Sequence, residues 1–259
     1  MPRLALLLAG LVLALLTSLG AAPARAVSPF ADWAAIVVAG DWHAHSGGPS
    51  EAFDNARHDV SLALQKAGFE AANLRQFSVR PERYRDAGLG RSERNAIFAS
   101  MLDLTGKATG GCLVYFSSHG APQGVVVGQD ILPPAVLAGM LDRTCGVRPT
   151  VVVISACFSG VFVPALAGAN RMVLTAARPD RSSFGCGEAD KYPYFDECFL
   201  SSMQGARTFL SLALAVQGCV ATRETKEGMK PPSEPQLFVG GALKPLLPLY
   251  SLASPPRPN

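Results

Sequence analysis

Long apolar runs, rather than alternating apolar and polar positions, dominate the centre of this 259-residue chain. Residues 113–116 and 151–154 are apolar throughout and rich in β-branched or aromatic side chains, and each run ends in small residues. Such runs are typical of strands that are buried on both faces of a parallel sheet. We therefore predict two central strands of an α/β domain.

Shorter patterns on either side of these runs predict the remaining elements. Further strands are expected over residues 34–40, 69–77, 171–177 and 236–240, with a small hairpin over 124–128 and 130–132. Helices are expected over residues 50–67, 95–104, 134–143, 161–167 and 194–216. The first helix has apolar residues at helical spacing, namely Phe53, Ala56, Val60 and Leu64.

The first 26 residues have the pattern of a secretory signal peptide. Arg3 supplies a positive start, residues 4–16 are apolar apart from one glycine, and Ala24-Arg25-Ala26 forms a small-x-small cleavage site. A retained anchor is the alternative, but the run is shorter than the roughly 20 residues of a membrane span. We expect an exported protein, periplasmic or secreted, with one domain over residues 27–245 and a proline-rich tail over 246–259.

The charge balance argues against nucleic acid as a partner. The chain has 23 basic and 20 acidic residues, and two of the basic ones, Arg3 and Arg25, lie in the predicted leader. The 21 basic and 20 acidic residues that remain form no basic cluster to neutralise phosphates. The arginines of residues 80–94 are typical of a solvated surface. No later segment is apolar and long enough to span a membrane.

Two reactive side chains follow the two central strands. His119 comes three positions after the end of the first apolar run, and Cys157 comes three positions after the end of the second. Because the carboxyl ends of parallel strands meet at one edge of a sheet, we expect these side chains to face the same crevice. A thiol nucleophile and an imidazole that moves protons are the groups that cysteine-based catalysis needs. Gly120 allows a close approach of substrate backbone.

Six cysteines in an exported chain suggest disulfides, because the compartment beyond the inner membrane is oxidising. Cys112 and Cys145 are the favoured pair, since each precedes one of the two central strands and these strands should be neighbours. Neighbouring strands lie roughly 4.8 Å apart, which suits a disulfide. Two buried free thiols are the alternative.

The loop over residues 41–50 invites a metal interpretation. His43 and His45 have the His-x-His spacing of many metal sites, and Asp41 and His58 lie close in the sequence. No full ligand set follows, so we expect loop histidines and no metal or other cofactor. Nothing in the sequence indicates an oligomeric state.

The motifs at the two strand ends resemble those of a known family. Ser118-His119-Gly120 and Ser155-Ala156-Cys157-Phe158-Ser159-Gly160 are similar to the catalytic motifs of legumain-like cysteine peptidases, relatives of caspases and gingipains. The likeness continues through residues 175–177, 181–186 and 194–195, and the chain looks like a compact, exported bacterial member. It implies a caspase-like α/β fold, a six-stranded, mainly parallel sheet between two layers of helices. It also implies a dyad of His119 and Cys157.

The resemblance also suggests the substrate-binding residues. The Gly120 and Cys157 amides would form the oxyanion hole. Ser182 and Ser183 match a pair of serines that borders the crevice in the family, and Glu197 matches an acidic position. Arg181 stands where relatives have an acidic residue, and Ala52-Phe53 stand where legumains have an Arg-His pair. Arg57, in the first helix, is either a surface cation or a substrate anchor.

We therefore predict a thiol endopeptidase that acts on protein or peptide substrates through an acyl-enzyme. Arg181 favours an acidic or amide side chain at P1, because guanidinium binds a carboxylate through two hydrogen bonds. If Glu197 pairs with Arg181, a neutral amide suits the pocket better. A transpeptidase would use the same site with an amine in place of water. A catalytically silent binding protein on the same fold is the alternative from another class.

Overall fold

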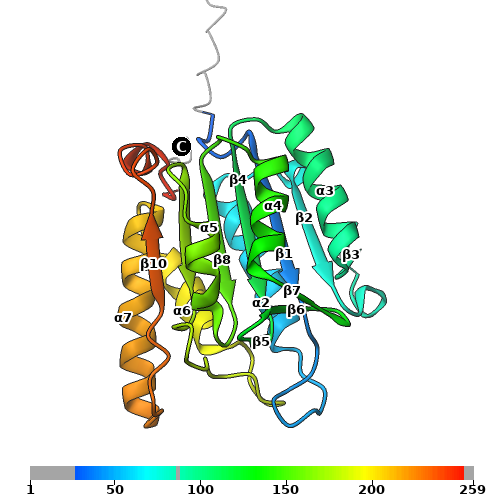
Figure 1. Ribbon diagram of the computed structural model, residues 1–259, viewed down its shortest axis with the longest axis vertical. Helices are drawn as coiled ribbons and strands as arrows, with labels where there is room; N and C mark the ends of the chain where they lie inside the picture. The colour runs from blue at the N-terminus through cyan, green and yellow to red at the C-terminus, as the bar shows by residue number, and fades with distance from the viewer. Residues whose placement is uncertain (1–26, 86–87, 254–259) are drawn as a thin grey trace, which may run out of the picture.

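The computed structural model describes residues 27–85 and 88–253, and a mainly parallel sheet runs through the middle of the domain (Figure 1). The predicted signal peptide, residues 1–26, and the last six residues of the predicted tail lie outside the described residues. In spatial order the strands are β10 (Gln236–Val239), β9 (Arg171–Thr175), β8 (Thr150–Ser155), β4 (Gly111–Ser117), β1 (Trp33–Ala39), β2 (Leu74–Ser78) and β3 (Gly90–Arg91).

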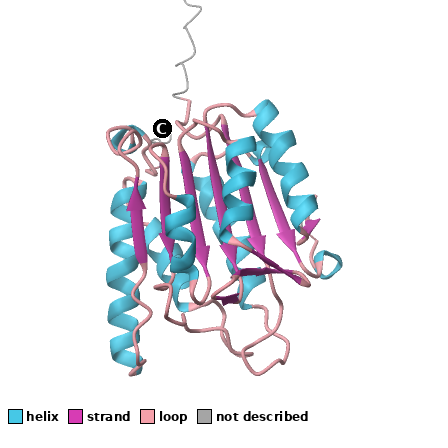
Figure 2. Ribbon diagram, in the orientation of Figure 1, coloured by secondary structure: helices cyan, strands magenta, loops and turns pink. Residues whose placement is uncertain are grey.

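Two details of this sheet extend the six-strand expectation. β3 adds a seventh strand beside β2. It has two residues, Gly90 and Arg91, which is too short to form an apolar run that can be detected in the sequence. β10 alone is antiparallel to its neighbour, β9, as the arrows in Figure 2 show. The strands at the centre, β1, β4 and β8, are buried at every position, which explains their uninterrupted apolar sequence.

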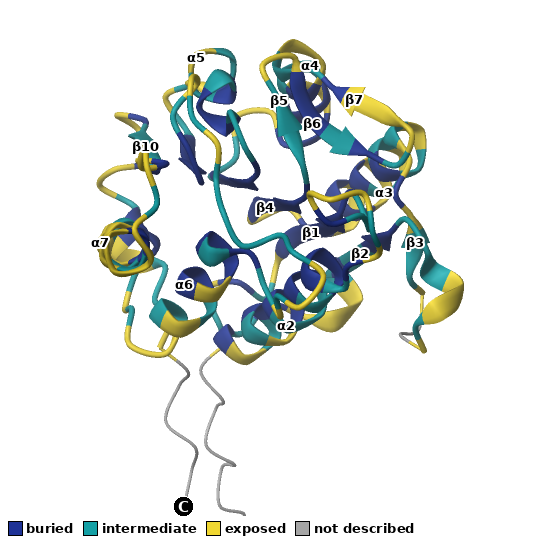
Figure 3. Cartoon of the chain, turned by 90° about the horizontal axis from the view of Figure 1, so that it is seen from below, coloured by how far each residue is buried: buried dark blue, intermediate teal, exposed yellow. Residues whose placement is uncertain are grey.

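Helices cover both faces of the sheet, which gives three layers (Figure 3). On one face lie α3 (Arg94–Lys107), α4 (Pro134–Thr144) and α5 (Phe162–Leu166), and on the other lie α2 (Ala52–Ala67), α6 (Tyr194–Met203) and α7 (Phe209–Glu227). Short 3₁₀ turns are η1 (Ala71–Asn73), η2 (Pro81–Arg83), η3 (Ser159–Val161) and η4 (Leu247–Leu249). Among the described residues, no helix has the length and apolar character that a membrane crossing requires.

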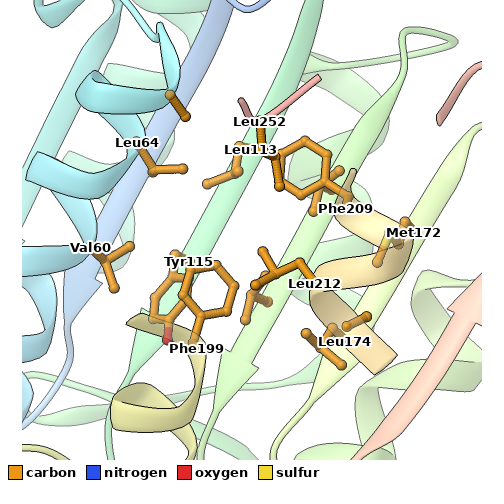
Figure 4. Packing of buried hydrophobic residues seen from close by; sticks show 14 of the residues in the cluster. Val60, Leu64, Leu113, Tyr115, Met172, Leu174, Phe199, Phe209, Leu212 and Leu252 are labelled. Carbon is orange, nitrogen blue, oxygen red and sulfur yellow. The ribbon is translucent and has the colours of Figure 1, made fainter. Parts of the chain in front are cut away.

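Successive residues of the central strands supply the two cores in turn. Leu113 and Tyr115 of β4 point to the face of α2, α6 and α7, where Figure 4 shows them among Phe199 and Leu212. The alternate residues of the strand face the opposite layer of helices, namely Cys112, Val114 and Phe116. Each fully buried apolar side chain of this size contributes about 1.5–3 kcal/mol, so the alternation fixes the register of β4.

The predicted hairpin is a separate small sheet. β5 (Gly120–Ala121), β6 (Gly124–Val127) and β7 (Asp130–Leu132) pair antiparallel in that order. β5 follows directly after His119, so this sheet lies at the carboxyl end of β4.

The single helix expected over residues 194–216 is wrong, because the chain forms two helices there. α6 ends at Met203, and α7 begins after Thr208, whose hydroxyl accepts a hydrogen bond from the Ser211 amide in a capping box. A capped start of this kind stabilises a new helix rather than the continuation of the first. A disulfide between Cys198 and Cys219, which the sequence did not suggest, joins the two helices.

The C-terminal part of the domain extends past residue 245, where the sequence predicted its end. Leu247 and Leu252 are buried in the core on the α2, α6 and α7 face. The Tyr250 ring lies edge-on to Trp33, with 4.9 Å between ring centroids. The segment leading up to residue 253 therefore belongs to the domain.

A buried carboxyl ties the first turn of α6 to the sheet. Asp196 is fully buried, and its Oδ1 accepts a hydrogen bond from the Tyr115 hydroxyl at 2.6 Å. Its Oδ2 accepts from the Ser117 hydroxyl at 3.0 Å and from the Ser155 hydroxyl at 2.6 Å. Burial raises the pKa of Asp196 from 3.8 to about 6, although the three hydroxyl donors oppose this rise.

A second tie lies at the opposite end of β4, where a disulfide joins Cys112 to Cys145 with 6.0 Å between their Cα atoms. This is the pair that the sequence favoured. Cys112 pairs in register with Thr150 at the start of β8, and Cys145 caps α4.

We predict that replacing both Cys112 and Cys145 by alanine lowers the free energy of unfolding by about 3–4 kcal/mol. The bridge closes a loop with a sequence separation of 33, and loss of that constraint increases the entropy of the unfolded chain. Urea denaturation of the double variant measures the change. Two alkylatable thiols at these positions in the non-reduced native protein would contradict it.

The Asp196 carboxyl predicts a specific pH dependence of stability. In the unfolded chain it loses its proton near pH 4, whereas in the folded protein it keeps the proton to about pH 6. The folded state then binds more protons in this window, so the free energy of unfolding falls as pH rises from about 4 to about 6. We expect the stability advantage over Asp196→Asn to shrink by up to about 3 kcal/mol between pH 4 and pH 7. Urea denaturation at both pH values measures this, and an equal difference would contradict it.

Candidate active site

The structure places His119 and Cys157 at the same edge of the sheet. His119 lies two residues past the end of β4, and Cys157 lies two residues past the end of β8. The two strands are parallel neighbours, and Ser117 pairs in register with Ser155. Both side chains therefore leave the sheet at the same level, as the sequence predicted from the apolar runs.

Gly120 brings the two strand ends into direct contact. A Cβ atom at this position would stand 2.1 Å from the Cys157 carbonyl oxygen and 3.0 Å from the Ala156 Cβ. Neither backbone nor a methyl group can yield that much space, so only glycine fits. The segment after His119 thus packs against the segment that contains Cys157.

The His119 ring is held by a backbone carbonyl. Its Nε2 lies 2.9 Å from the carbonyl oxygen of His43, in the loop after β1, and the Phe53 ring packs edge-on at 5.0 Å between centroids. A carbonyl oxygen only accepts hydrogen bonds, so Nε2 has the proton and Nδ1 keeps the free lone pair. His43 contributes its backbone, while its own ring is bound to Asp41 at 2.7 Å.

Cys157 is half-buried and faces Ser183 of the loop over residues 178–190. Its Sγ accepts a hydrogen bond from the Ser183 amide at 3.3 Å and lies 3.5 Å from the Ser183 carbonyl oxygen. Phe158, the next residue, has a φ of 57°, which is uncommon for a side chain of its size. Its amide donates to the Arg181 carbonyl oxygen at 2.7 Å, so the loop braces the sharp turn that presents the thiol.

Two backbone amides beside the thiol are available as donors. Within the part of the chain that the structure describes, the Cys157 amide has no acceptor. In the β5–β6 ladder Gly120 faces Val125, while the Val126 amide donates to the His119 carbonyl oxygen. Gly120 is therefore at a non-hydrogen-bonded position, and the ladder does not use its amide.

Of the predicted pocket residues in the loop, Ser183 touches the thiol and its neighbour Ser182 is exposed to solvent. The Arg181 guanidinium makes an ion pair with Asp180 at 2.7 Å. Its Nε is buried and, among the described residues, has no acceptor. Arg181 thus supports the turn through its carbonyl group, and its buried Nε–H is an unused donor among the described residues.

Glu197 and Arg57 have other partners than the sequence suggested. Glu197 is half exposed and pairs with Arg223 of α7, not with Arg181, so the condition under which a neutral amide would suit the pocket better is not met. Glu197 lines a hollow between α2 and α6 together with Tyr192. Arg57 is 1% exposed and is not a surface cation.

The Arg57 guanidinium lies in a buried polar network between α2 and β2. Its Nε donates to Asp54 at 3.0 Å, and a second nitrogen donates to Gln76. The guanidinium also lies 5.2 Å from the centroid of the Tyr84 ring. Burial raises the pKa of Asp54, and the neighbouring Arg57 charge opposes this rise.

Cys186, in the same loop as Ser183, is the other free thiol of the described residues. Burial is the main cause that raises the pKa of Cys186 to about 11, and the neighbouring Cys157 contributes to this rise. Cys186 is therefore protonated at neutral pH and a poor nucleophile. No group of three or more histidine, cysteine or acidic side chains in the described residues could hold a metal ion.

Sequence reasoning missed Asp196, which lies beneath the two strand ends that present His119 and Cys157. A signal was available, because the polar residues Ser117 and Ser155 directly follow the two apolar runs, 113–116 and 151–154. Two hydroxyls in such positions require a buried partner. Which distant residue supplies it depends on the packing of α6.

Comparisons with known proteins bear on the fold and the family of the chain. No curated protein sequence matches the chain. A solved structure, the crystal structure of caspase-1 from Spodoptera frugiperda, is similar with a TM-score of 0.60 and 15% sequence identity, over 84% of this chain and 90% of the caspase chain. At that identity the match shows the fold, which is caspase-like.

The family model of the Peptidase C13 family matches residues 50–211, a stretch that includes both strand ends, His119 and Cys157. That stretch is well over half of the 259 residues. The chain therefore belongs to the Peptidase C13 family of cysteine peptidases.

Proposed function

We propose that the protein is a thiol endopeptidase with Cys157 as nucleophile and His119 as the proton carrier. The observation that supports this best is the juxtaposition of a half-buried thiol with an imidazole whose Nε2 is held by the His43 carbonyl. The imidazole leaves Nδ1 free to take a proton. Two unused amides, from Gly120 and Cys157, add the donors that an oxyanion needs.

The proposed reaction begins when His119 takes the thiol proton and the Cys157 sulfur attacks the substrate carbonyl carbon. The carbonyl electrons move to oxygen, where the Gly120 and Cys157 amides stabilise the charge. The imidazolium then protonates the leaving amine as the C–N bond breaks, which leaves an acyl-enzyme. Water attacks the thioester, its proton passes through His119, and the sulfur recovers its proton when the acid leaves.

We also propose that the protein acts outside the cytoplasm. The signal-peptide pattern of residues 1–26 supports export, and two disulfides suit an oxidising compartment.

We predict that Cys157→Ala and His119→Ala each reduce peptide cleavage by at least about 1,000-fold, because each removes a group that changes bonds or protons. Cleavage of a peptide library, followed by mass spectrometry, measures this. Cys186→Ala is the matched control and should stay within about threefold of the wild type, since its thiol is protonated. Thermal denaturation shows whether the variants are folded. Near-normal cleavage by either dyad variant, or no cleavage by the wild type, would overturn the proposal.

We further propose a preference for an acidic or amide side chain at P1, with Arg181 as the discriminating cation. Arg181 lies two residues before Ser183, which touches the Cys157 sulfur. Its buried Nε–H has no acceptor among the described residues, and an N–H donor suits a carboxylate or amide oxygen. Asp180 neutralises part of the guanidinium charge, which allows an uncharged amide as well.

Arg181→Glu should lower kcat/KM for a P1 Asp peptide by about tenfold or more, because a charge-assisted hydrogen bond is lost and a repulsion is gained. Cleavage of matched peptides with Asp, Asn or Lys at P1 gives the order of preference. Arg178→Glu is the control, because Arg178 also binds Asp180 but is exposed. An unchanged order in Arg181→Glu would mean that other residues form the pocket.

A further inference from the structure

We propose that Asp196 is a positioning residue, which holds the ends of β4 and β8 together and thereby sets the position of His119 relative to Cys157. This inference rests on the proposed function of that pair. Asp196 touches neither His119 nor Cys157. It acts through Ser117 and Ser155, each of which lies two residues before one of them.

The hydrogen bonds of Asp196 join the two strands at one atom. Oδ2 accepts from Ser117, the last residue of β4, and from Ser155, the last residue of β8. These serines are register partners, so the carboxylate spans the last rung of the parallel ladder. Oδ1 accepts from Tyr115, which fixes the orientation of the carboxylate on the β4 side.

Beyond this rung, the segment after Ser117 and the segment after Ser155 are bound to each other. The Ser118 amide donates to the Ser155 carbonyl oxygen at 3.0 Å, and the Ser118 hydroxyl donates to Val126 at 2.8 Å. Gly120 packs against the Cys157 carbonyl group without room for one more carbon. A shift of Ser117 relative to Ser155 is therefore transmitted to His119 and Cys157.

The helix that carries Asp196 is itself fixed. The Cys198–Cys219 disulfide lies two residues further along α6 and joins it to α7. The Phe195 and Phe199 side chains are buried on either side of the carboxylate in the sequence. Asp196 thus reaches the strand ends from a helix that is also joined covalently to α7.

A purely structural tie would not need a carboxylate here. In the described part of the chain, no cation forms an ion pair with Asp196, and burial raises its pKa to about 6. Burying a carboxyl without a cation is unfavourable, and well-packed apolar groups usually stabilise a core as well or better. A carboxylate offers two oxygens that accept several hydrogen bonds at fixed angles, which apolar packing cannot reproduce. Precise alignment of the strand ends explains its presence better than stability does.

The effect should appear in the chemical step more than in binding, because a small misplacement of reacting groups lowers rate steeply. We expect Asp196→Ala to lower kcat for peptide cleavage by about 10- to 100-fold with KM changed less than threefold. Ser117→Ala and Ser155→Ala should each give a smaller loss. Asp196→Asn, which keeps one oxygen and the shape, should recover part of the activity.

A second measurement does not depend on peptidase activity. In a Cys186→Ala background, the rate of iodoacetamide alkylation reports on Cys157 as the remaining thiol that is free in the described residues. Asp196→Ala should slow this alkylation at least about threefold. A shift of the strand ends would move the Cys157 thiol away from the Ser183 amide and the His119 imidazole, which favour its reactive form. If the wild type cleaves no peptide, the proposed function fails, while the alkylation rates still decide the role of Asp196.

Glu224→Gln is the matched control. Glu224 is also buried and accepts hydrogen bonds from the Ser233 amide and hydroxyl, but it lies on α7 and binds neither strand end. This variant should lose stability, measured by urea denaturation, with kcat and the alkylation rate within about twofold of the wild type. If Asp196→Ala behaves in the same way, the positioning role is overturned. Should Asp196→Ala not fold, the Ser117→Ala/Ser155→Ala double variant replaces it, and unchanged kcat and alkylation in that variant would overturn the role equally.

Discussion

Parallel pairing between β4 and β8 is the constraint on which the site depends. The ladder matches six residues of each strand and ends at Ser117 and Ser155. Because the strands run in the same direction, both chains leave the sheet at one edge and at one level. An antiparallel pair would have sent His119 and Cys157 to opposite edges. Gly120 contacts the Cys157 carbonyl group because the short segments after β4 and β8 begin at the same level of the sheet.

The central strand pairing and the positions of His119 and Cys157 could be predicted from the sequence because their causes are local. Burial on both faces of a strand produces an unbroken apolar run, and the end of that run is visible as a change to small residues. The His119 and Cys157 positions follow from those ends without any knowledge of the helices. The hairpin of β6 and β7 was equally readable, since glycine punctuates two short β-branched segments.

Features that depend on distant packing could not be read in this way. Residues 194–216 have regular apolar spacing on both sides of the break after Met203. A prediction from periodicity alone therefore gave one helix where the structure has α6 and α7. The polarity of Arg57 gave no indication that Asp54 and Gln76 would enclose it. Glu197 was assigned to the pocket from its place in a motif, but its orientation depends on Arg223, which belongs to another helix.

The two ends of β4 are held by different chemistry, and the difference suits their tasks. At the far end, the Cys112–Cys145 disulfide fixes the chain covalently, where only the separation of sheet and helix matters. At the functional end, hydroxyl donors converge on Asp196, and hydrogen bonds of this kind specify both distance and direction. A disulfide there would place a pair of sulfur atoms near the Cys157 thiol and invite thiol–disulfide exchange. A hydrogen-bonded carboxylate joins the same two strands without a group that can react with the Cys157 thiol.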